Sequence, residues 1–155
     1  MPYIARGGKY VFGRSKVGKT GKIAIPQEAM NEYGLADWKK VILMSGGRRS
    51  GGFALTTPGL LRGSPLSSVL DRLPQLRRFQ MPEGRVVRIG GRAFCWKTIE
   101  EGACITLPPE TLREYEIMVG DLLLVVKGSP IAIGFALRGP IIEEASRHPG
   151  LKVFE

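Results

Sequence analysis

Histidine is almost absent from this chain of 155 residues, which contains a single imidazole, His148. Ser/His/Asp and Cys/His catalytic sets need that side chain beside the nucleophile, so neither kind of active site can be assembled elsewhere in the sequence. The two cysteines, Cys95 and Cys104, do not stand at a spacing typical of zinc ligands. We therefore expect no enzymatic activity, no metal and no cofactor. We expect both thiols to be buried in a protein of the reducing cytoplasm, with a hairpin disulfide as the alternative.

Long apolar runs are missing too. The longest, LLLVV at 122–126, has the length of a strand, whereas a membrane-spanning helix needs about 20 apolar residues. The first ten residues, MPYIARGGKY, lack the apolar core of a signal peptide. Apolar residues nevertheless make up 43% of the chain, enough for one domain with a proper core. These features favour a folded cytoplasmic protein without a membrane partner.

Acidic residues are scarce relative to basic ones. The chain has 14 Asp and Glu against 23 Lys and Arg, which gives a formal net charge of +9. The excess is uneven, because residues 4–60 hold ten basic and three acidic side chains whereas residues 86–142 hold six of each. A charge of this size favours nucleic acid or another polyanion as the partner.

The sequence contains one pattern twice, with an offset of 82 residues. Residues 6–58 align with 88–140 without a gap, and 14 of the 53 pairs are identical, against roughly four expected by chance from this composition. The clearest match is GGFALTTP at 51–58 with IGFALRGP at 133–140. The pattern indicates an internal duplication whose two copies have diverged in charge.

Each copy is expected to fold as strand, strand, short helix, strand, strand. Pro26 and Pro108 precede amphipathic segments and suit the first turn of a helix, where a missing N–H costs nothing. Gly34 predicts the end of the first helix, and Ser64-Pro65 predicts the start of a linker helix that Pro74 ends. The expected strands are 10–12, 22–25, 41–44, 53–56, 122–127 and 133–137, and the expected helices are 27–33, 110–115 and 141–147.

Two stretches resemble a known family of regulators. TGKIAIPQEAMNEYGLADWKKVILM at 20–44 and EGACITLPPETLREYEIMVGDLLLVV at 101–126 share a hydrophobic-x-hydrophobic-Pro turn, an amphipathic helix and a buried strand. The unit is similar to that of the AbrB/MraZ/SpoVT swapped-hairpin family, and two tandem copies look most like the MraZ layout. The resemblance implies a mainly β fold with short helices, in which two repeats build a swapped-hairpin β-barrel around a pseudo-two-fold axis. It implies one domain over 1–155, with repeats at about 4–60 and 86–142 and a partly helical linker at 61–85.

The same resemblance implies a DNA-binding transcriptional regulator with double-stranded DNA as its partner. The helix positions where AbrB-type proteins carry a pair of arginines are Met30-Asn31 in copy 1, so we assign the DNA contacts to basic residues of repeat 1. These residues cluster in Gly-rich segments, where backbone N–H groups and cationic side chains can both approach phosphate oxygens. The candidate nucleic-acid-binding residues are Arg6, Lys9, Arg14, Lys16, Lys19, Lys22, Arg48 and Arg49. Whether the chain forms a homo-oligomer, and whether its repeats pair within one chain or between chains, stays open.

One motif points to a different function. GRSKVGKT at 13–20 fits the phosphate-loop pattern G-x-x-x-x-G-K-[ST]. A working phosphate loop needs a helix that starts at its Lys-Thr, whereas GKIAIP at 21–26 is typical of a strand followed by proline. We therefore interpret the motif as a hairpin turn whose basic residues meet a nucleic-acid backbone, and as a decoy for ATP or GTP binding. The alternative function is a non-catalytic barrel that binds a small ligand or a protein.

Overall fold

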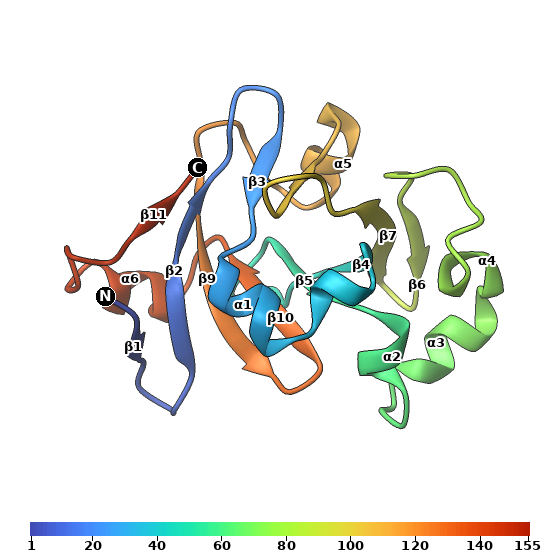
Figure 1. The fold of residues 1–155 in the computed structure, drawn as a ribbon, viewed down its shortest axis with the longest axis horizontal. Helices are drawn as coiled ribbons and strands as arrows, with labels where there is room; N and C mark the ends of the chain where they lie inside the picture. Colours follow the sequence, from blue (N-terminus) through green and yellow to red (C-terminus); the bar gives the residue numbers. More distant parts are fainter.

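The chain is mainly β. A computed structural model, which describes residues 1–155, has two sheets and six short α-helices (Figure 1). The strands are β1 (Tyr3–Ile4), β2 (Tyr10–Lys16), β3 (Lys22–Ala24), β4 (Lys40–Ser45), β5 (Phe53–Thr56), β6 (Val87–Ile89), β7 (Arg92–Thr98), β8 (Cys104–Thr106), β9 (Leu122–Ser129), β10 (Ala132–Ala136) and β11 (Val153–Phe154). The helices are α1 (Gln27–Glu32), α2 (Pro58–Leu61), α3 (Ser67–Arg72), α4 (Pro74–Arg77), α5 (Pro109–Glu114) and α6 (Pro140–Ala145). None of these helices has the length and apolarity that a membrane crossing requires.

The strand order interleaves the two halves of the chain. The larger sheet runs β1-β2-β9-β10-β5-β4-β7-β6, with β11 pairing in parallel beside β2, while β3 and β8 form a separate antiparallel pair. The long strand β2 therefore pairs with β9, and β7 pairs with β4. Gly13 lies opposite Val125 in the first pair, and Cys95 lies opposite Leu43 in the second. Both partners differ by 82 residues between the two pairs, so the register is the same at the two ends of the sheet.

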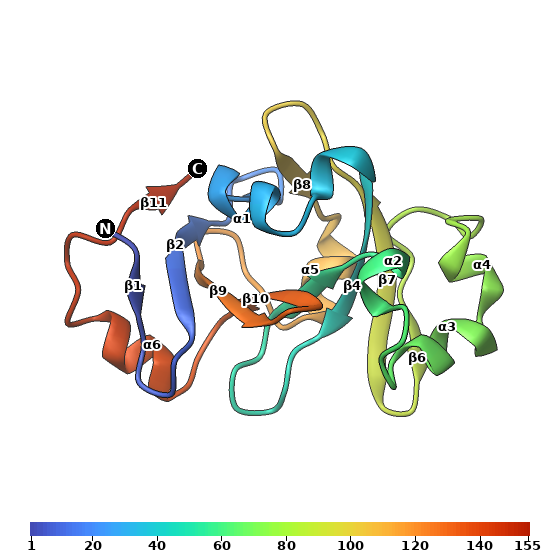
Figure 2. The ribbon, with the colours of Figure 1, turned by 60° about the horizontal axis from the view of Figure 1, so that its bottom comes forward.

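The predicted closed barrel is wrong for this structure, because the large sheet is open. At one end β6 pairs only with β7, and at the other β2 is bordered by the short strands β1 and β11. The outer faces of these two ends are covered by helices instead of by each other. Helix α6 packs over β2 and β9, and α2, α3 and α4 pack over β4 and β7. Figure 2 shows these helices at opposite ends of the molecule.

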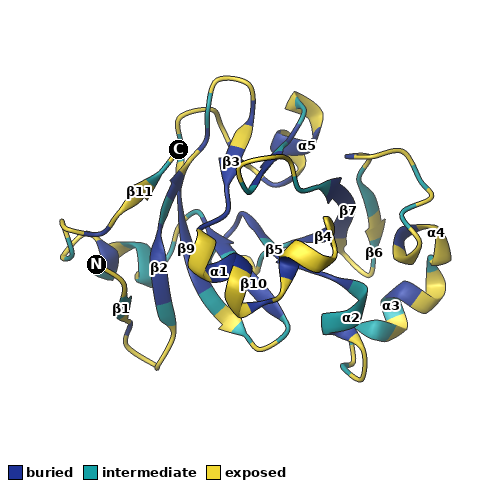
Figure 3. Cartoon of the chain, in the orientation of Figure 1, coloured by how far each residue is buried: buried dark blue, intermediate teal, exposed yellow.

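Strand alternation divides the side chains between two faces of the sheet. Successive residues of a strand point to opposite sides, so Leu43 enters the main core whereas Ile42 meets the linker helices. The main core of 23 buried residues lies between the sheet and the layer formed by α1, α5, β3 and β8. Tyr33 and Tyr115, the C-cap residues of α1 and α5, lie in that core, and their hydroxyls donate to backbone carbonyls of strand residues. Figure 3 shows the buried sheet beneath exposed helix surfaces.

The expected elements are largely present, and the differences have local causes. Strand β5 has the predicted bounds, but β2 continues to Lys16 because β9 supplies partners along its whole length. The linker helix α3 begins at Ser67, so the predicted start at Ser64-Pro65 is wrong: the Ser64 carbonyl instead accepts a turn hydrogen bond from Ser67. Helix α2 was not expected, and Thr57 caps it by accepting from the Leu60 N–H at 3.1 Å.

Candidate nucleic-acid interface

The structure separates the basic residues of repeat 1 into two groups. Strand β2 carries the chain from the β1–β2 turn, which holds Arg6 and Lys9, to the β2–β3 turn, which holds Lys19. Its seven residues extend about 3.4 Å each, so the two turns lie more than about 20 Å apart. Figure 1 shows the β1–β2 turn at the lower edge of the molecule and the β2–β3 turn at the upper edge. No continuous positive surface therefore runs from Arg6 to Lys22.

The second group consists of Arg14, Lys16, Lys19 and Lys22. The sequence predicted that these residues lie on one hairpin turn, and the structure does not place them there. Arg14 and Lys16 lie on β2 and Lys22 lies on β3, so only Lys19 belongs to the turn itself. The Arg14 guanidinium is half-buried and donates to the Ala145 carbonyl at 2.8 Å, where it satisfies the end of α6. Lys16 is exposed and lies 3.9 Å from Glu155. The turn is followed by strand β3, so no helix begins at Lys19 to receive a nucleotide phosphate.

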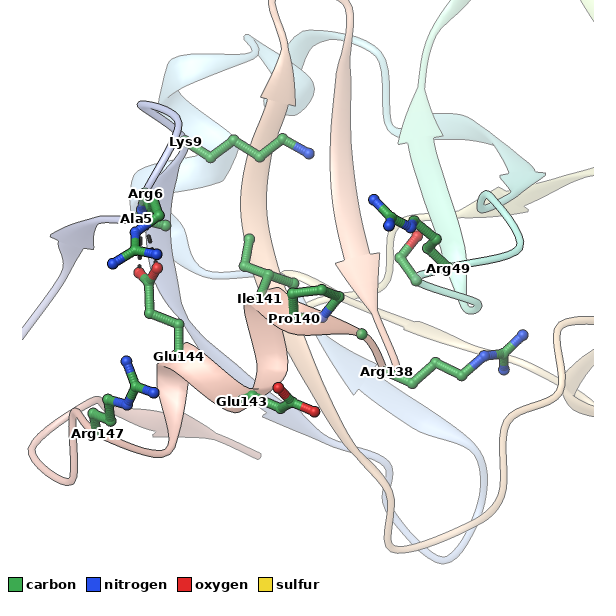
Figure 4. A pocket seen from close by; sticks show the side chains of 12 residues that line it. Ala5, Arg6, Lys9, Arg49, Arg138, Pro140, Ile141, Glu143, Glu144 and Arg147 are labelled. Carbon is green, nitrogen blue, oxygen red and sulfur yellow. Dashed lines mark hydrogen bonds between the residues drawn. The ribbon is translucent and has the colours of Figure 1, made fainter.

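The first group includes Arg6, Lys9 and Arg49. These residues come from distant segments of the sequence and line one cleft of about 540 Å³. Three segments form its walls: the β1–β2 turn, the β4–β5 hairpin, and the chain from the end of β10 through α6 (Figure 4). We call it the cationic cleft, because five of its twelve lining residues are basic and two are acidic. The five basic residues are Arg6, Lys9, Arg49, Arg138 and Arg147, and the acidic ones are Glu143 and Glu144.

Most of the positive charge in the cationic cleft has no partner within the protein. The side chains of Arg6, Lys9, Arg49 and Arg147 make no ion pair and donate no hydrogen bond. Figure 4 shows Lys9 reaching over Ile141, with Arg49 facing it from the β4–β5 hairpin. The Glu144 carboxylate is already occupied, since it accepts the Arg6 backbone N–H at 3.1 and 3.3 Å. A mobile anion is the natural counter-charge for four such cations.

Local sequence fixes the β4–β5 hairpin against the chain that leaves β10. The Ser50 carbonyl accepts from the backbone N–H of Leu137 at 2.7 Å and of Arg138 at 2.9 Å. Gly52 has φ of +63°, and a Cβ on it would lie 2.1 Å from the Phe135 carbonyl oxygen, so only glycine fits there. The hairpin that presents Arg48 and Arg49 is therefore held in place by backbone contacts from the second half of the chain.

Basic residues of the second half extend the cationic cleft along the same side of the molecule. A smaller cleft beside the β4–β5 hairpin is lined by Arg48, Arg88 and Arg138, and another by Lys9 and Arg92. The β1–β2, β4–β5 and β6–β7 turns all lie along the lower edge in Figure 2. We call this surface the basic face, and it consists of Arg6, Lys9, Arg48, Arg49, Arg88, Arg92, Arg138 and Arg147.

Two arginines of the basic face are partly neutralised by glutamates of α5 and of the segment that follows it. Arg88 donates to Glu114 at 2.6 Å, and Arg138 donates to Glu116 at 3.1 Å and to the Arg48 carbonyl at 3.1 Å. Both ion pairs are exposed, so water screens them and weakens their hold on the arginines. The guanidinium groups thus stay available to an anion at modest cost.

Sequence reasoning missed half of the basic face. Arg88, Arg92 and Arg138 were passed over because residues 86–142 are neutral as a whole, and Arg147 because it lies in a tail with Glu143 and Glu144. The sequence match at the 82-residue offset held a usable signal for one of them, since Arg88 is the identical partner of Arg6 there. Arg147 follows α6 and meets the others only because α6 folds back over β2.

Three of the four glutamates that match at the 82-residue offset make contacts between elements. Glu28 of α1 accepts from the Tyr10 hydroxyl at 2.6 and 2.8 Å, and this hydrogen bond raises the pKa of Tyr10 to about 12. Glu32 pairs with Lys127 of β9, and Glu114 pairs with Arg88. No group of three or more His, Cys, Asp or Glu side chains is placed to hold a metal ion.

No family model matches the chain, and no curated protein or solved structure matches it either.

Proposed function

We propose that this protein binds double-stranded DNA through the basic face and acts as a transcriptional regulator of the AbrB/MraZ type. The single observation that carries the proposal is the set of four unpartnered cations in the cationic cleft, Arg6, Lys9, Arg49 and Arg147. Phosphate contacts from Lys and Arg supply most of the affinity of proteins for a DNA backbone. The two free, buried cysteines fit the reducing cytoplasm in which such a regulator would act.

The composition of the face favours a duplex over a single strand. Single-strand binders stack bases on exposed aromatic rings. The aromatic residues that border these clefts, Phe53, Tyr115 and Phe135, are fully buried and offer no ring to a base. What the face presents is arginine, lysine and backbone at turns, the groups that contact phosphates along a duplex. We therefore favour backbone contacts with double-stranded DNA.

We also infer that the chain is a single domain of two duplicated units with exchanged strands around a pseudo-two-fold axis. The bounds of β2, β3 and α1 each lie 82 residues before those of β7, β8 and α5. Strands β2 and β7 each pair with a strand of the other half, in the same register. The β1–β2 and β6–β7 turns are then equivalent, and they place basic residues on both sides of the β4–β5 hairpin.

A salt titration of duplex binding tests the proposed function. The measurement is fluorescence anisotropy of a labelled duplex of mixed sequence, repeated between about 50 and 200 mM salt. If four phosphates are neutralised, the logarithm of the association constant should fall linearly with the logarithm of salt, with a slope near about −3.6. Absence of binding at the lowest salt, with the chain folded, would contradict the proposal.

A further inference from the structure

A second cleft, with more hydrophobic lining residues, adjoins the cationic cleft on the outer face of the sheet. This neighbouring cleft has a volume of about 190 Å³ and shares Lys9, Ser50 and Ile141 with the cationic cleft. It lies over the central strand pair β5·β10, in the gap between α6 at one end of the sheet and the linker helices at the other. We call it the sheet groove.

The floor of the sheet groove follows from strand alternation in FALT and AIGFA. Phe53, Leu55, Ile133 and Phe135 point into the main core, so the residues between them point outward. Those outward residues are small: Ala54 lies opposite Gly134 at the centre of the sheet. A Cβ on Gly134 would lie 2.9 Å from Val126 Cγ2, so the Val126 side chain takes the space beside Gly134, and the small Ala54 side chain leaves the remaining floor open.

The two joined clefts offer different chemistry at their two ends. The cationic end presents the unpartnered Lys9 ammonium and Arg49 guanidinium, with Glu143 as the exposed carboxylate nearby. The groove end presents Ala54, Val126 and Ile141 along with backbone, and the Arg92 side chain also lines it. The volume of the cationic cleft alone lies in the range of about 300–1,000 Å³ that is typical of small-molecule sites. An anion of one or two charges that carries a small flat group suits this arrangement.

We infer that the cationic cleft and the sheet groove together bind a nucleoside phosphate. The phosphate lies between Lys9 and Arg49, where charge-assisted hydrogen bonds hold it, and the base covers the floor at Ala54 and Val126. Because the phosphate occupies cations of the basic face, the bound nucleotide competes with a DNA backbone. The site is separate from GRSKVGKT, whose Lys19 lies at the far end of β2. The competition rests on the proposed function, whereas nucleotide binding does not.

Calorimetric titration of the full chain in the absence of DNA tests the inference. The probes are AMP, GMP, CMP and UMP in turn, with inorganic phosphate and adenosine as the two half-ligands. At least one nucleotide should bind about tenfold more tightly than inorganic phosphate, since a buried flat group adds about 1.4 kcal/mol or more. Equal affinity for nucleotide and phosphate, or no heat with any nucleotide, overturns the inference.

Two pairs of variants locate the ligand. Ala54→Leu fills the groove floor and should weaken the nucleotide about tenfold while leaving phosphate unchanged, whereas the matched Ala36→Leu, at an exposed position outside both clefts, should bind as the wild type does. Lys9→Ala should weaken both probes, and Lys19→Ala should weaken neither. Thermal melting confirms that each variant is folded. Nucleotide binding that Ala54→Leu does not change overturns the placement of the base.

The result is distinguishable from failure of the proposed function. Ala54→Leu leaves all eight residues of the basic face intact, so it should bind duplex DNA as the wild type does. A chain that binds duplex but no nucleotide overturns this inference alone. A chain that binds a nucleotide but no duplex overturns the proposed function alone. When both bind, saturating nucleotide should displace the labelled duplex, and simultaneous binding would overturn the competition.

Discussion

Phe53 and Phe135 lie directly opposite each other on β5 and β10, with their rings stacked at a centroid distance of 4.7 Å and an interplanar angle of 20°. They are also partners at the 82-residue offset of the sequence. Ile23 and Ile105 stand in the same relationship on β3 and β8. A residue that pairs with its own counterpart must sit on the axis that relates two equivalent units, so these two pairs mark the inferred pseudo-two-fold axis through both sheets.

The stacked phenylalanines should be energetically coupled. We predict that Phe53→Leu and Phe135→Leu interact in a double-mutant cycle by about 0.5–1.5 kcal/mol, because either substitution alone removes the ring contact. Urea unfolding of the two single variants and the double variant measures the coupling. Phe12 and Phe94 form the matched control: they are also identical partners 82 residues apart, but they belong to different clusters. Their Leu substitutions should add within about 0.5 kcal/mol, and coupling there as strong as at Phe53 and Phe135 would contradict the inferred axis.

Adding a glycine after α5 and removing the glycine after α1 should change the stability of the protein in opposite directions. Gly34 and Glu116 follow these helices at equivalent positions, with left-handed φ values of +61° and +63°. Glu116→Gly should raise the free energy of unfolding by up to about 1 kcal/mol, because glycine adopts this conformation without strain. Gly34→Ala should lower it by about 1 kcal/mol, since no neighbouring atom lies near the new Cβ and only backbone strain acts. Thermal melting compares the two, and a destabilised Glu116→Gly would show that its exposed pair with Arg138 matters more than the strain.

Both cysteine thiols should resist alkylation in the folded protein. Cys95 and Cys104 are free and buried, and burial raises the pKa of Cys95 to about 11 and also raises that of Cys104. The reactive thiolate is therefore scarce at pH 8. Mass spectrometry after brief iodoacetamide treatment should find neither residue labelled in the folded chain and both labelled in urea. Resistance of both residues in urea without reductant would reveal a disulfide and contradict the structure.

The raised pKa of Cys95 should make the free energy of unfolding fall with pH in the alkaline range. The Cys95 thiol stays protonated in the folded state up to about pH 11, whereas an unfolded thiol ionises near about 8.5. The stabilisation from this group is fully present below the unfolded pKa and is lost as pH rises towards 11. Urea midpoints should therefore decline between pH 8.5 and 11, and Cys95→Ala should show a smaller decline than the wild type. Identical declines in the two proteins would contradict the role of this thiol.

The sequence predicted elements better than their assembly. Strand β5 and helices α1 and α5 were found because proline, glycine and alternating apolar residues are local signals. The sequence did not predict that the large sheet is open. Nothing in the sequences of the short strands β1 and β6 indicates that each pairs with only one neighbouring strand. Helix α2 was missed because its four residues, PGLL, carry no periodicity.

For the candidate site too, closeness in sequence did not predict which basic residues lie together in the structure. Arg6 and Lys22 are close in sequence, and grouping them as one surface ignored the length of the strand between them. Arg6 and Arg49 are far apart in sequence, yet they line one cleft because β2 and β5 are both joined to the β9–β10 pair. Local charge density located Arg6, Lys9 and Arg49 but could not add Arg138, which has no basic neighbour in sequence, or Arg147, which follows two glutamates.

The most direct measurement compares duplex affinity for two doubly substituted chains of equal net charge. Lys9→Ala with Arg49→Ala removes two cations from the basic face, and Lys19→Ala with Lys22→Ala removes two from the far end of β2. If the basic face binds DNA, the first variant should bind the labelled duplex at least about tenfold more weakly, with a salt slope reduced by about 1.8, while the second should stay close to the wild type. Equal losses in both variants, or a larger loss in the second, would contradict the assignment of DNA binding to this face.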